Sequence, residues 1–146
     1  MAMTAREAFE KGTATFNTHD IAGFAEVLAD DVLFKAPGGM HGEGKAACAA
    51  FFGGWFAAFP DAHVEVQAVH IMDDFAVEEG IFTGTQDGVL RGPAGDIPPT
   101  GRSVEVDYVH VLRYRDRKHV SFNLMFDRLM MLEQLGVVPA PALELG

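Results

Sequence analysis

Two side chains capable of proton transfer, Tyr108 and His110, lie two residues apart in the run from Val104 to Arg115. That run is rich in β-branched and aromatic residues and predicts a strand, on which residues two apart share a face. A histidine, with a reference pKa of about 6.5, can act as a general base near neutral pH. A tyrosine hydroxyl can donate a hydrogen bond to a developing oxyanion. The alternative is a core histidine paired with a backbone carbonyl or a buried carboxylate.

His70 is a second candidate for a functional role. It lies in the alternating run from His63 to Met72, where it would share one face of a strand with small apolar residues. On that face it would either line a pocket or pair with Glu78 or Glu79 of the following strand. The sequence leaves open which face of the sheet carries these two glutamates.

Three other polar side chains have contexts that favour structural roles. Asp127 directly precedes a helical pattern that starts at Arg128, where aspartate is a good N-cap. His119 follows the charged turn Asp116-Arg117-Lys118, so we expect it to be exposed. Cys48 has small and apolar neighbours and no adjacent base, which favours a buried structural thiol. The sequence shows no metal-ligand spacing, no phosphate-binding glycine loop and no Ser-His-Asp or Cys-His pattern, so we expect no metal.

The overall composition excludes several classes of partner. The chain has 146 residues, the size of one domain, and its apolar fraction of 49% is typical of globular proteins. Its net charge of −10 repels phosphate backbones and anionic lipids, so we expect neither nucleic acid nor a membrane as a partner. The N-terminus lacks an apolar signal core, and the longest uncharged apolar stretch, residues 46–59, is shorter than the roughly 18 residues of a membrane span. We therefore expect a cytoplasmic protein.

Helical signals dominate the first sixty residues. Thr4 and Glu7 form a capping-box pattern at the start of a first helix. Asp20 can cap a short second helix that carries apolar residues as far as Leu28. A short strand is predicted over residues 32–36, before a Pro-Gly-Gly turn.

A third helix is predicted from Gly44 to Phe59, and it is apolar on nearly all sides. The pair Gly53-Gly54 is costly inside a helix and would be explained by a close-packed neighbour or a kink. Trp55, Phe56 and Phe59 belong to the core, and one side of this helix should also form a pocket wall.

Strand patterns dominate the second half of the chain. The expected strands are His63–Met72, Phe75–Gln86, Val104–Arg115 and His119–Asp127, followed by a helix over Arg128–Leu135. Helices followed by long antiparallel strands indicate the α+β class. We expect one domain over residues 1–138, in which N-terminal helices pack on a strongly curved antiparallel sheet to form a cone with an internal pocket. Residues 139–146 are expected to be a flexible tail.

The motifs that carry a family resemblance occur in order along almost the whole chain. They are Phe16-Asn17-Thr18, Gly53 with Trp55 and Phe59, residues 98–102 (PPTGR), residues 111–116 (VLRYRD), Phe126-Asp127 with Leu129, and Gln134-Leu135-Gly136. On these residues the chain resembles the SnoaL-like polyketide cyclases of the nuclear transport factor 2-like superfamily, also called cystatin-like α+β cones. The resemblance implies a homodimer or larger homo-oligomer, no metal, no organic cofactor, and a hydrophobic pocket for a polyketide- or steroid-sized molecule.

The resemblance also implies positions for the catalytic groups. These cyclases close a ring by an intramolecular aldol reaction, in which a carbon flanked by carbonyls loses a proton and the enolate attacks an aldehyde or ketone. The family's acid/base aspartate falls on Leu124, and a histidine two residues before it falls on Phe122; neither residue can move a proton. A family asparagine falls near Phe34 and a glutamine on Tyr108, whereas the histidine of the long strand is present as His110.

These observations favour a cofactor-independent enzyme of the cyclase or isomerase type that acts on a small hydrophobic carbonyl compound, with His110 as base and Tyr108 as oxyanion donor. The alternative is a non-catalytic protein that binds a small hydrophobic metabolite. Val109 and Val111 alternate with Tyr108 and His110, so they are expected on the outer face of the sheet. Exposed β-branched residues of this kind indicate a dimer contact. The residues expected to line the pocket are Phe34, Trp55, Phe56, Phe59, His70, Leu112, Phe122 and Leu124.

Overall fold

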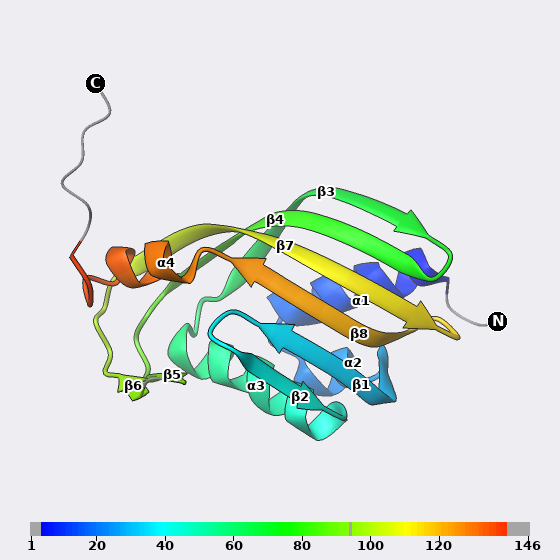
Figure 1. The fold of residues 1–146 in the computed structure, drawn as a ribbon, viewed down its shortest axis with the longest axis horizontal. Helices are drawn as coiled ribbons and strands as arrows, with labels where there is room; N and C mark the ends of the chain where they lie inside the picture. The colour runs from blue at the N-terminus through cyan, green and yellow to red at the C-terminus, as the bar shows by residue number, and fades with distance from the viewer. Residues whose placement is uncertain (1–3, 94, 140–146) are drawn as a thin grey trace.

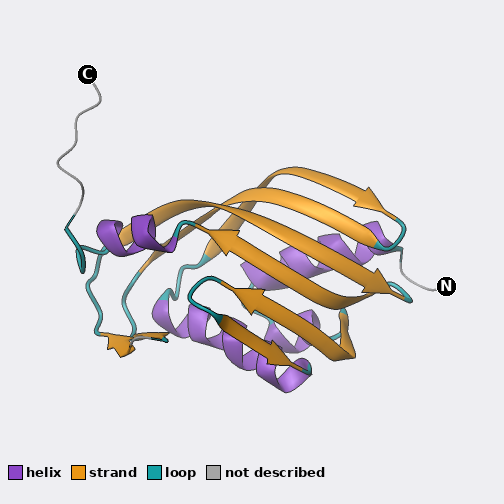
Figure 2. Ribbon diagram, in the orientation of Figure 1, coloured by secondary structure: helices purple, strands orange, loops and turns teal. Residues whose placement is uncertain are grey.

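The computed structural model describes residues 4–93 and 95–139 and has the predicted α+β architecture, with helices packed against a strongly curved sheet (Figures 1 and 2). The helices are α1 (Ala5–Asn17), α2 (Ile21–Ala25), α3 (Lys45–Ala58) and α4 (Arg128–Gln134). The strands are β1 (Leu28–Ala36), β2 (Met40–Glu43), β3 (His63–Met72), β4 (Phe75–Thr85), β5 (Leu90–Gly92), β6 (Gly95–Ile97), β7 (Ser103–Arg115) and β8 (Lys118–Phe126). Helices α1, α2 and α3 lie on one face of the large sheet, and α4 lies beyond the end of β8.

The large sheet is mixed. Its strand order is β2-β1-β8-β7-β4-β3, and every pair is antiparallel except β1 with β8, which run parallel. The expectation of a wholly antiparallel sheet is wrong at this pair, because β1 and β8 are distant in the chain and no tight turn fixes their relative direction. The predicted hairpin of β7 and β8 is confirmed, and Asp116 and Arg117 make its turn with φ values of 50° and 65°.

The end of the second helix and three short strands differ from the sequence expectation. The second helix ends at Ala25 rather than at Leu28, where β1 begins. Leu28 is completely buried and faces His119 across the β1–β8 pair, so strand pairing overrides the helical spacing of the apolar residues. Strands β2, β5 and β6 lie in segments where the sequence analysis expected no helix or strand; with three or four residues each, they are too short for alternation to be recognised.

The predicted helix caps are confirmed. The Thr4 hydroxyl accepts a hydrogen bond from the Glu7 amide at 3.1 Å, and the Thr4 amide donates to the Glu7 carboxylate at 3.2 Å. The carboxylate of Asp20 accepts from the Gly23 amide at the start of α2. Asp127 accepts from the amide two residues beyond Arg128, at 3.0 Å, so its carboxylate caps α4 as expected.

The glycine pair in α3 is not explained by close packing. A Cβ atom built on Gly53 would meet Ile21 at 3.5 Å, which is ordinary contact, and one built on Gly54 would meet nothing within 4 Å. Each glycine costs a helix about 1 kcal/mol relative to alanine. The structure therefore contains free space in front of Gly54, at a position where a larger residue would strengthen the helix.

The core lies between α3 and the concave face of the sheet. Phe59 is completely buried, and its ring packs edge-on against Phe82 of β4 with the ring centroids 5.4 Å apart. Phe34 of β1 packs on Phe51 of α3 at 4.9 Å. The tail expected over residues 139–146 lies outside the described residues except for Pro139. No helix in the described part of the chain is long and apolar enough to cross a membrane.

Candidate functional site

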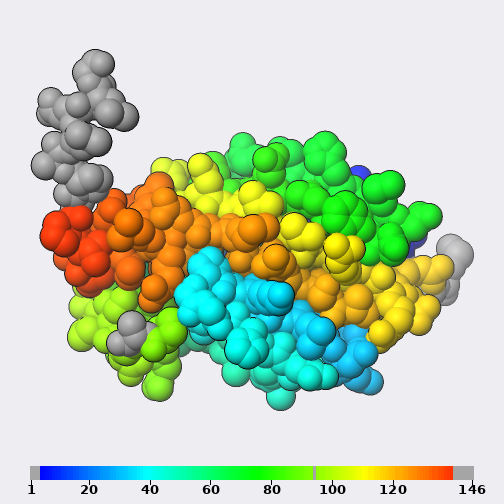
Figure 3. Space-filling model, in the orientation of Figure 1, coloured from blue at the N-terminus to red at the C-terminus, as the bar shows by residue number. Residues whose placement is uncertain are grey.

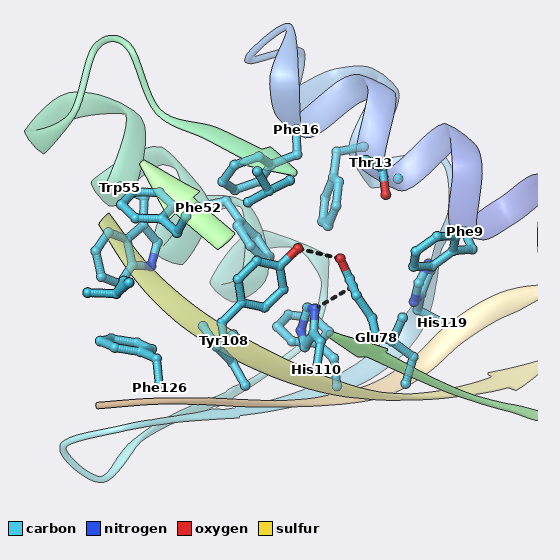
Figure 4. A pocket seen from close by; sticks show the side chains of 18 of the residues that line it. Phe9, Thr13, Phe16, Phe52, Trp55, Glu78, Tyr108, His110, His119 and Phe126 are labelled. Carbon is cyan, nitrogen blue, oxygen red and sulfur yellow. Dashed lines mark hydrogen bonds and ion pairs between the residues drawn. The ribbon is translucent and has the colours of Figure 1, made fainter. Parts of the chain in front are cut away.

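A cavity of about 90 Å³ lies between α1 and the concave face of the sheet, and we call it the inner cavity (Figure 4). Its walls are mainly aromatic and aliphatic side chains from α1, α3, β4, β7 and β8. A small set of polar side chains interrupts this apolar lining: Thr13, Glu78, Tyr108, His110 and His119. An apolar cavity with a few convergent polar groups is the usual form of a small-molecule site.

The carboxylate of Glu78 contacts the side chains of both Tyr108 and His110 (Figure 4). The Tyr108 hydroxyl donates a hydrogen bond to Glu78 Oε2 at 2.5 Å. The other carboxylate oxygen, Oε1, lies 3.4 Å from His110 Nδ1. The Glu78 side chain is 7% exposed and the His110 side chain 15% exposed, so the low-dielectric surroundings strengthen these interactions.

Strand register explains how these three groups meet. Glu78 of β4 and His110 of β7 are directly opposed across an antiparallel pair, and Tyr108 is opposed to Gly80. A Cβ atom on Gly80 would lie 2.5 Å from the Tyr108 hydroxyl oxygen, so the ring occupies space that a side chain at position 80 would fill. The missing side chain of Gly80 therefore lets Tyr108 extend across β4 to the Glu78 carboxylate.

The surroundings set the protonation of the tyrosine. Burial raises the pKa of Tyr108 far above its usual range, and the charge of Glu78 and the hydrogen bond to it raise this pKa further. Tyr108 therefore keeps its proton and acts as a hydrogen-bond donor. On His110, Nδ1 is the nitrogen that faces the carboxylate, whereas Nε2 is buried and has no hydrogen-bond partner among the described residues. This leaves Nε2 available to a ligand.

His119 is a second histidine in the inner cavity, where it lies near Phe9 (Figure 4). The expectation that it is exposed is wrong: it is 5% exposed. A register shift between Arg113 and Tyr114 interrupts the alternation of the β7–β8 pair, and His119 turns inward three residues before the buried Phe122. Burial lowers the pKa of His119 to about 3, with a smaller effect from nearby His110, so the ring is neutral at physiological pH.

The sequence profile of the SnoaL-like domain matches residues 9–122. The chain belongs to the SnoaL-like family. No curated protein sequence matches it.

Solved structures share this SnoaL-like fold over most of their length. AclR of Streptomyces galilaeus, a candidate hydroxylase, is 24% identical with a TM-score of 0.79 over 94% of this chain and 85% of that protein. IdmH of Streptomyces antibioticus, a candidate polyketide cyclase, is 25% identical with a TM-score of 0.75 over 90% and 98%. TsrD of Streptomyces laurentii is 22% identical with a TM-score of 0.78 over 91% and 95%.

The structure brings together most, but not all, of the residues that the SnoaL-like resemblance and the strand patterns assigned to a pocket. Phe34 lines a different, outer pocket. Phe56 and Phe59 line neither pocket within the described residues; Phe56 stacks on His19 at 4.2 Å. The predicted residues that do line the inner cavity are Trp55, Tyr108, His110, Leu112, Phe122 and Leu124.

The placement of His70 in a pocket is wrong. A register shift between Val66 and Ala68 changes the face on which later residues of β3 lie, so Val69 and Ile71 pack on the core while His70 is exposed. His70 is paired in register with Val77, and the described residues give it no ion pair with either neighbouring glutamate.

Glu78 is the functional residue that sequence reasoning did not assign. The family's aspartate position, Leu124, flanks His110 on β8, whereas Glu78 flanks it from β4 on the opposite side. The alternation of Ala76, Glu78 and Phe82 on the buried face of β4 was the available signal. This alternation did not identify Glu78, because Glu79 is the next residue. The sequence alone does not show which of the two glutamates faces the core.

Among the described residues, no group of three or more histidine, cysteine, aspartate or glutamate side chains is placed to hold a metal ion. Two buried atoms besides His110 Nε2 also have no hydrogen-bond partner within the described part of the chain: the hydroxyl of Tyr114 and Nε2 of His119. Burial, with a smaller effect from Glu78, raises the pKa of Tyr114, so that hydroxyl stays protonated. Buried polar atoms of this kind need a water molecule or a ligand to satisfy them.

The buried His119 should make stability depend on pH. The folded pKa of about 3 lies below the unfolded value near 6.5, so unfolding takes up a proton, and stability is lost as pH falls from 6.5 towards 3. Between pH 7 and pH 5, wild type should lose about 2 kcal/mol more than His119→Gln, whose side chain does not titrate. Urea unfolding at the two pH values measures this difference; parallel losses in both proteins would contradict the assignment.

Proposed function

We propose that this SnoaL-like protein is a cofactor-independent enzyme of the cyclase or isomerase type that acts on a hydrophobic carbonyl compound by acid/base chemistry. The observation that carries the proposal is the buried His110, with Nδ1 beside Glu78 and Nε2 free in an apolar cavity. A carboxylate beside Nδ1 favours the tautomer that carries its proton on Nδ1, and this leaves the Nε2 lone pair able to take a proton.

The first step is removal of a proton from a carbon next to a carbonyl. The electron pair of the C–H bond moves to the carbonyl oxygen to form an enolate, and the proton goes to His110 Nε2. Glu78 stabilises the imidazolium that results, because its carboxylate lies beside Nδ1. In an isomerase the proton returns to another carbon; in a cyclase the enolate carbon attacks a second carbonyl of the same molecule, whose oxygen then takes the proton.

Tyr108 would stabilise the enolate oxygen. Its high pKa keeps the hydroxyl proton in place, and in the resting protein that proton is donated to Glu78. When His110 becomes a cation, Glu78 pairs with it and competes less strongly for the Tyr108 proton. The hydroxyl can then donate to the enolate, which is the moment at which a hydrogen bond accelerates the reaction.

The size of the inner cavity limits what reacts there. An apolar cavity of about 150 Å³ holds one benzene molecule, and the inner cavity is about 90 Å³. The cavity therefore fits a carbonyl group with its neighbouring carbons rather than a whole polycyclic molecule. A polyketide-like substrate of the kind suggested by similarity to the candidate cyclase IdmH would have to extend beyond it.

A small ketone tests the proposal directly. In D₂O, the protein should exchange the α-protons of 2-butanone for deuterium faster than buffer alone, as followed by loss of the proton NMR signals. This probe requires only the first step and fits a small cavity. Exchange at the buffer rate, together with line broadening that shows ketone binding, would instead support the alternative of a non-catalytic binding protein.

We also propose that the protein forms a homodimer through the outer face of the sheet. Apolar side chains of three neighbouring strands gather there: Val77, Ile81, Val109, Val111 and Met125. Met125 is 46% exposed in the single chain, and such a patch is typical of an interface.

Sedimentation at micromolar concentration should give about twice the chain mass of 15.8 kDa. Val109→Lys should shift the protein towards the mass of one chain, because a charge would be buried in the interface. A wild type that sediments as one chain would contradict the dimer.

A further inference from the structure

A second, larger hollow lies outside the inner cavity, and we call it the outer pocket. It has a volume of about 560 Å³ and lies between α3, the β1–β2 hairpin, the β5–β6 hairpin and α4. In the space-filling view the cyan β1–β2 hairpin, the orange α4 and the yellow-green β5–β6 hairpin border one another at this place (Figure 3). Trp55, Phe126 and Met131 line both the outer pocket and the inner cavity, so they form the wall between them.

The outer pocket combines an aromatic wall with positive charge. Phe34, Phe51 and Trp55 form much of its apolar side. Arg91 and Arg128 also line it, and no aspartate or glutamate does so among the described residues. This differs from the chain as a whole, which has 21 acidic and 11 basic residues.

The described residues provide no ion-pair partner for either arginine. Two acidic residues belong to the same hairpin and helix cap. Asp96 is opposed to Arg91 in the β5–β6 register without forming an ion pair, and the carboxylate of Asp127 caps α4. Two guanidinium groups on an apolar pocket are therefore available to an anion from outside the chain.

The side chain of Arg128 lies beside two glycines. A Cβ atom on Gly38 would lie 3.4 Å from Arg128 Nε, and one on Gly92 would lie 3.4 Å from Nη2. The half-buried guanidinium thus lies between the β1–β2 turn and the β5–β6 hairpin. Because these glycines have no side chains, the planar guanidinium has room there to bind a carboxylate through two parallel N–H···O bonds.

Gly54 supplies an independent indication that the outer pocket holds a ligand. It lines the pocket, and a Cβ atom there would meet nothing within 4 Å. A larger residue would favour the helix and fill the hollow, so folding alone gives no reason for glycine at this position. A glycine that weakens the helix but leaves a hollow unfilled is expected at a position where a ligand binds.

We propose that the outer pocket binds an amphiphilic carboxylate. The aromatic or aliphatic part of this ligand packs on Phe51 and Trp55 and fills the open space at Gly54. Its carboxylate binds Arg128, and Arg91 supplies a second positive charge. The inner cavity does not compete for such a ligand, because its charged group is the carboxylate of Glu78. The inference holds whether or not the inner cavity is catalytic.

Isothermal titration calorimetry with 2-naphthoate and with the neutral 2-naphthalenemethanol tests this site. The wild type should bind the carboxylate at least about tenfold more tightly than the alcohol, and the difference should shrink as salt concentration rises. Arg128→Gln should remove this difference. Arg91→Gln, at an exposed position where folding is not in question, should reduce it.

Arg117→Gln is the matched control, because it removes the same charge from the exposed β7–β8 turn at the other end of the sheet (Figure 1). Its affinity for 2-naphthoate should equal that of wild type. Loss of affinity equal to that of Arg128→Gln would mean that only net charge matters and would overturn the proposal. Equal binding of carboxylate and alcohol by wild type, or no binding of either, would overturn it as well.

Gly54→Leu tests occupation of the pocket itself. The substitution should raise the thermal unfolding temperature, since leucine favours a helix more than glycine, and should weaken 2-naphthoate binding at least about tenfold by filling the hollow. A stable Gly54→Leu protein with undiminished affinity would place the ligand elsewhere and refute the site. The calorimetric readout needs no turnover, so failure of the ketone exchange assay leaves this inference unaffected.

Discussion

Replacing His110 by glutamine should lower the rate of deuterium exchange into 2-butanone by roughly 10²–10⁴-fold, the usual effect of losing a positioned general base. Glutamine keeps a polar side chain of similar size but has no lone pair basic enough to take the proton. The aromatic walls that hold the ketone do not change, so the loss should appear in the rate and not in binding. Titration of the ketone by NMR line broadening measures binding separately.

The matched control is His70→Gln, because His70 is an exposed histidine on the outer face of the sheet. That variant should exchange the ketone at the wild-type rate. Retained exchange in His110→Gln, or equal losses in the two variants, would contradict the assignment of His110 as the base.

Glu78→Gln separates charge from shape at the same site. Glutamine can still accept a hydrogen bond from Tyr108, but it cannot stabilise an imidazolium at His110 through charge. We expect this variant to fold with little loss of stability and to exchange the ketone at least tenfold more slowly. The comparison assigns the catalytic effect to the carboxylate rather than to packing.

The sequence predicted the long elements of the fold because their signals are local. Strand β3 and the β7–β8 hairpin follow from alternation and from the charged turn between them. The parallel pairing of β1 with β8 has no local signal, since the two segments come together only in the folded chain. The same pairing converts the end of the expected second helix into the start of β1.

The candidate site was partly predictable for the same reason. Tyr108 and His110 are two residues apart in a regular strand, so their common face was clear. His70 and His119 were misplaced because register shifts in β3 and near the β7–β8 turn change the face on which they lie. Glu78 was missed because its role depends on β4 lying beside β7. The amino-acid sequence of β4 does not indicate which strand it pairs with.

The site can be tested by moving the carboxylate from one side of His110 to the other, because the strand order places one strand on each side of β7. Glu78 of β4 and Leu124 of β8 are the two register partners of His110. Glu78→Leu should lower ketone exchange at least tenfold and also cost about 1–3 kcal/mol, because the buried Tyr108 hydroxyl loses its acceptor. Leu124→Asp alone should lower stability, because it adds a second carboxylate that has no partner in the cavity.

The double variant Glu78→Leu/Leu124→Asp should then exchange the ketone faster than Glu78→Leu, although more slowly than wild type. Directly opposed residues have Cβ atoms about 4.5–5.5 Å apart, so an aspartate on β8 can reach the imidazole that the leucine on β4 no longer contacts. Tyr108 is opposed to Phe126 rather than to Leu124, so its hydrogen bond is not restored and recovery is partial. Exchange rates and urea unfolding of all four proteins complete the cycle. If Leu124→Asp changes neither stability nor rate in either background, position 124 does not face the cavity, and the arrangement of groups around His110 is wrong.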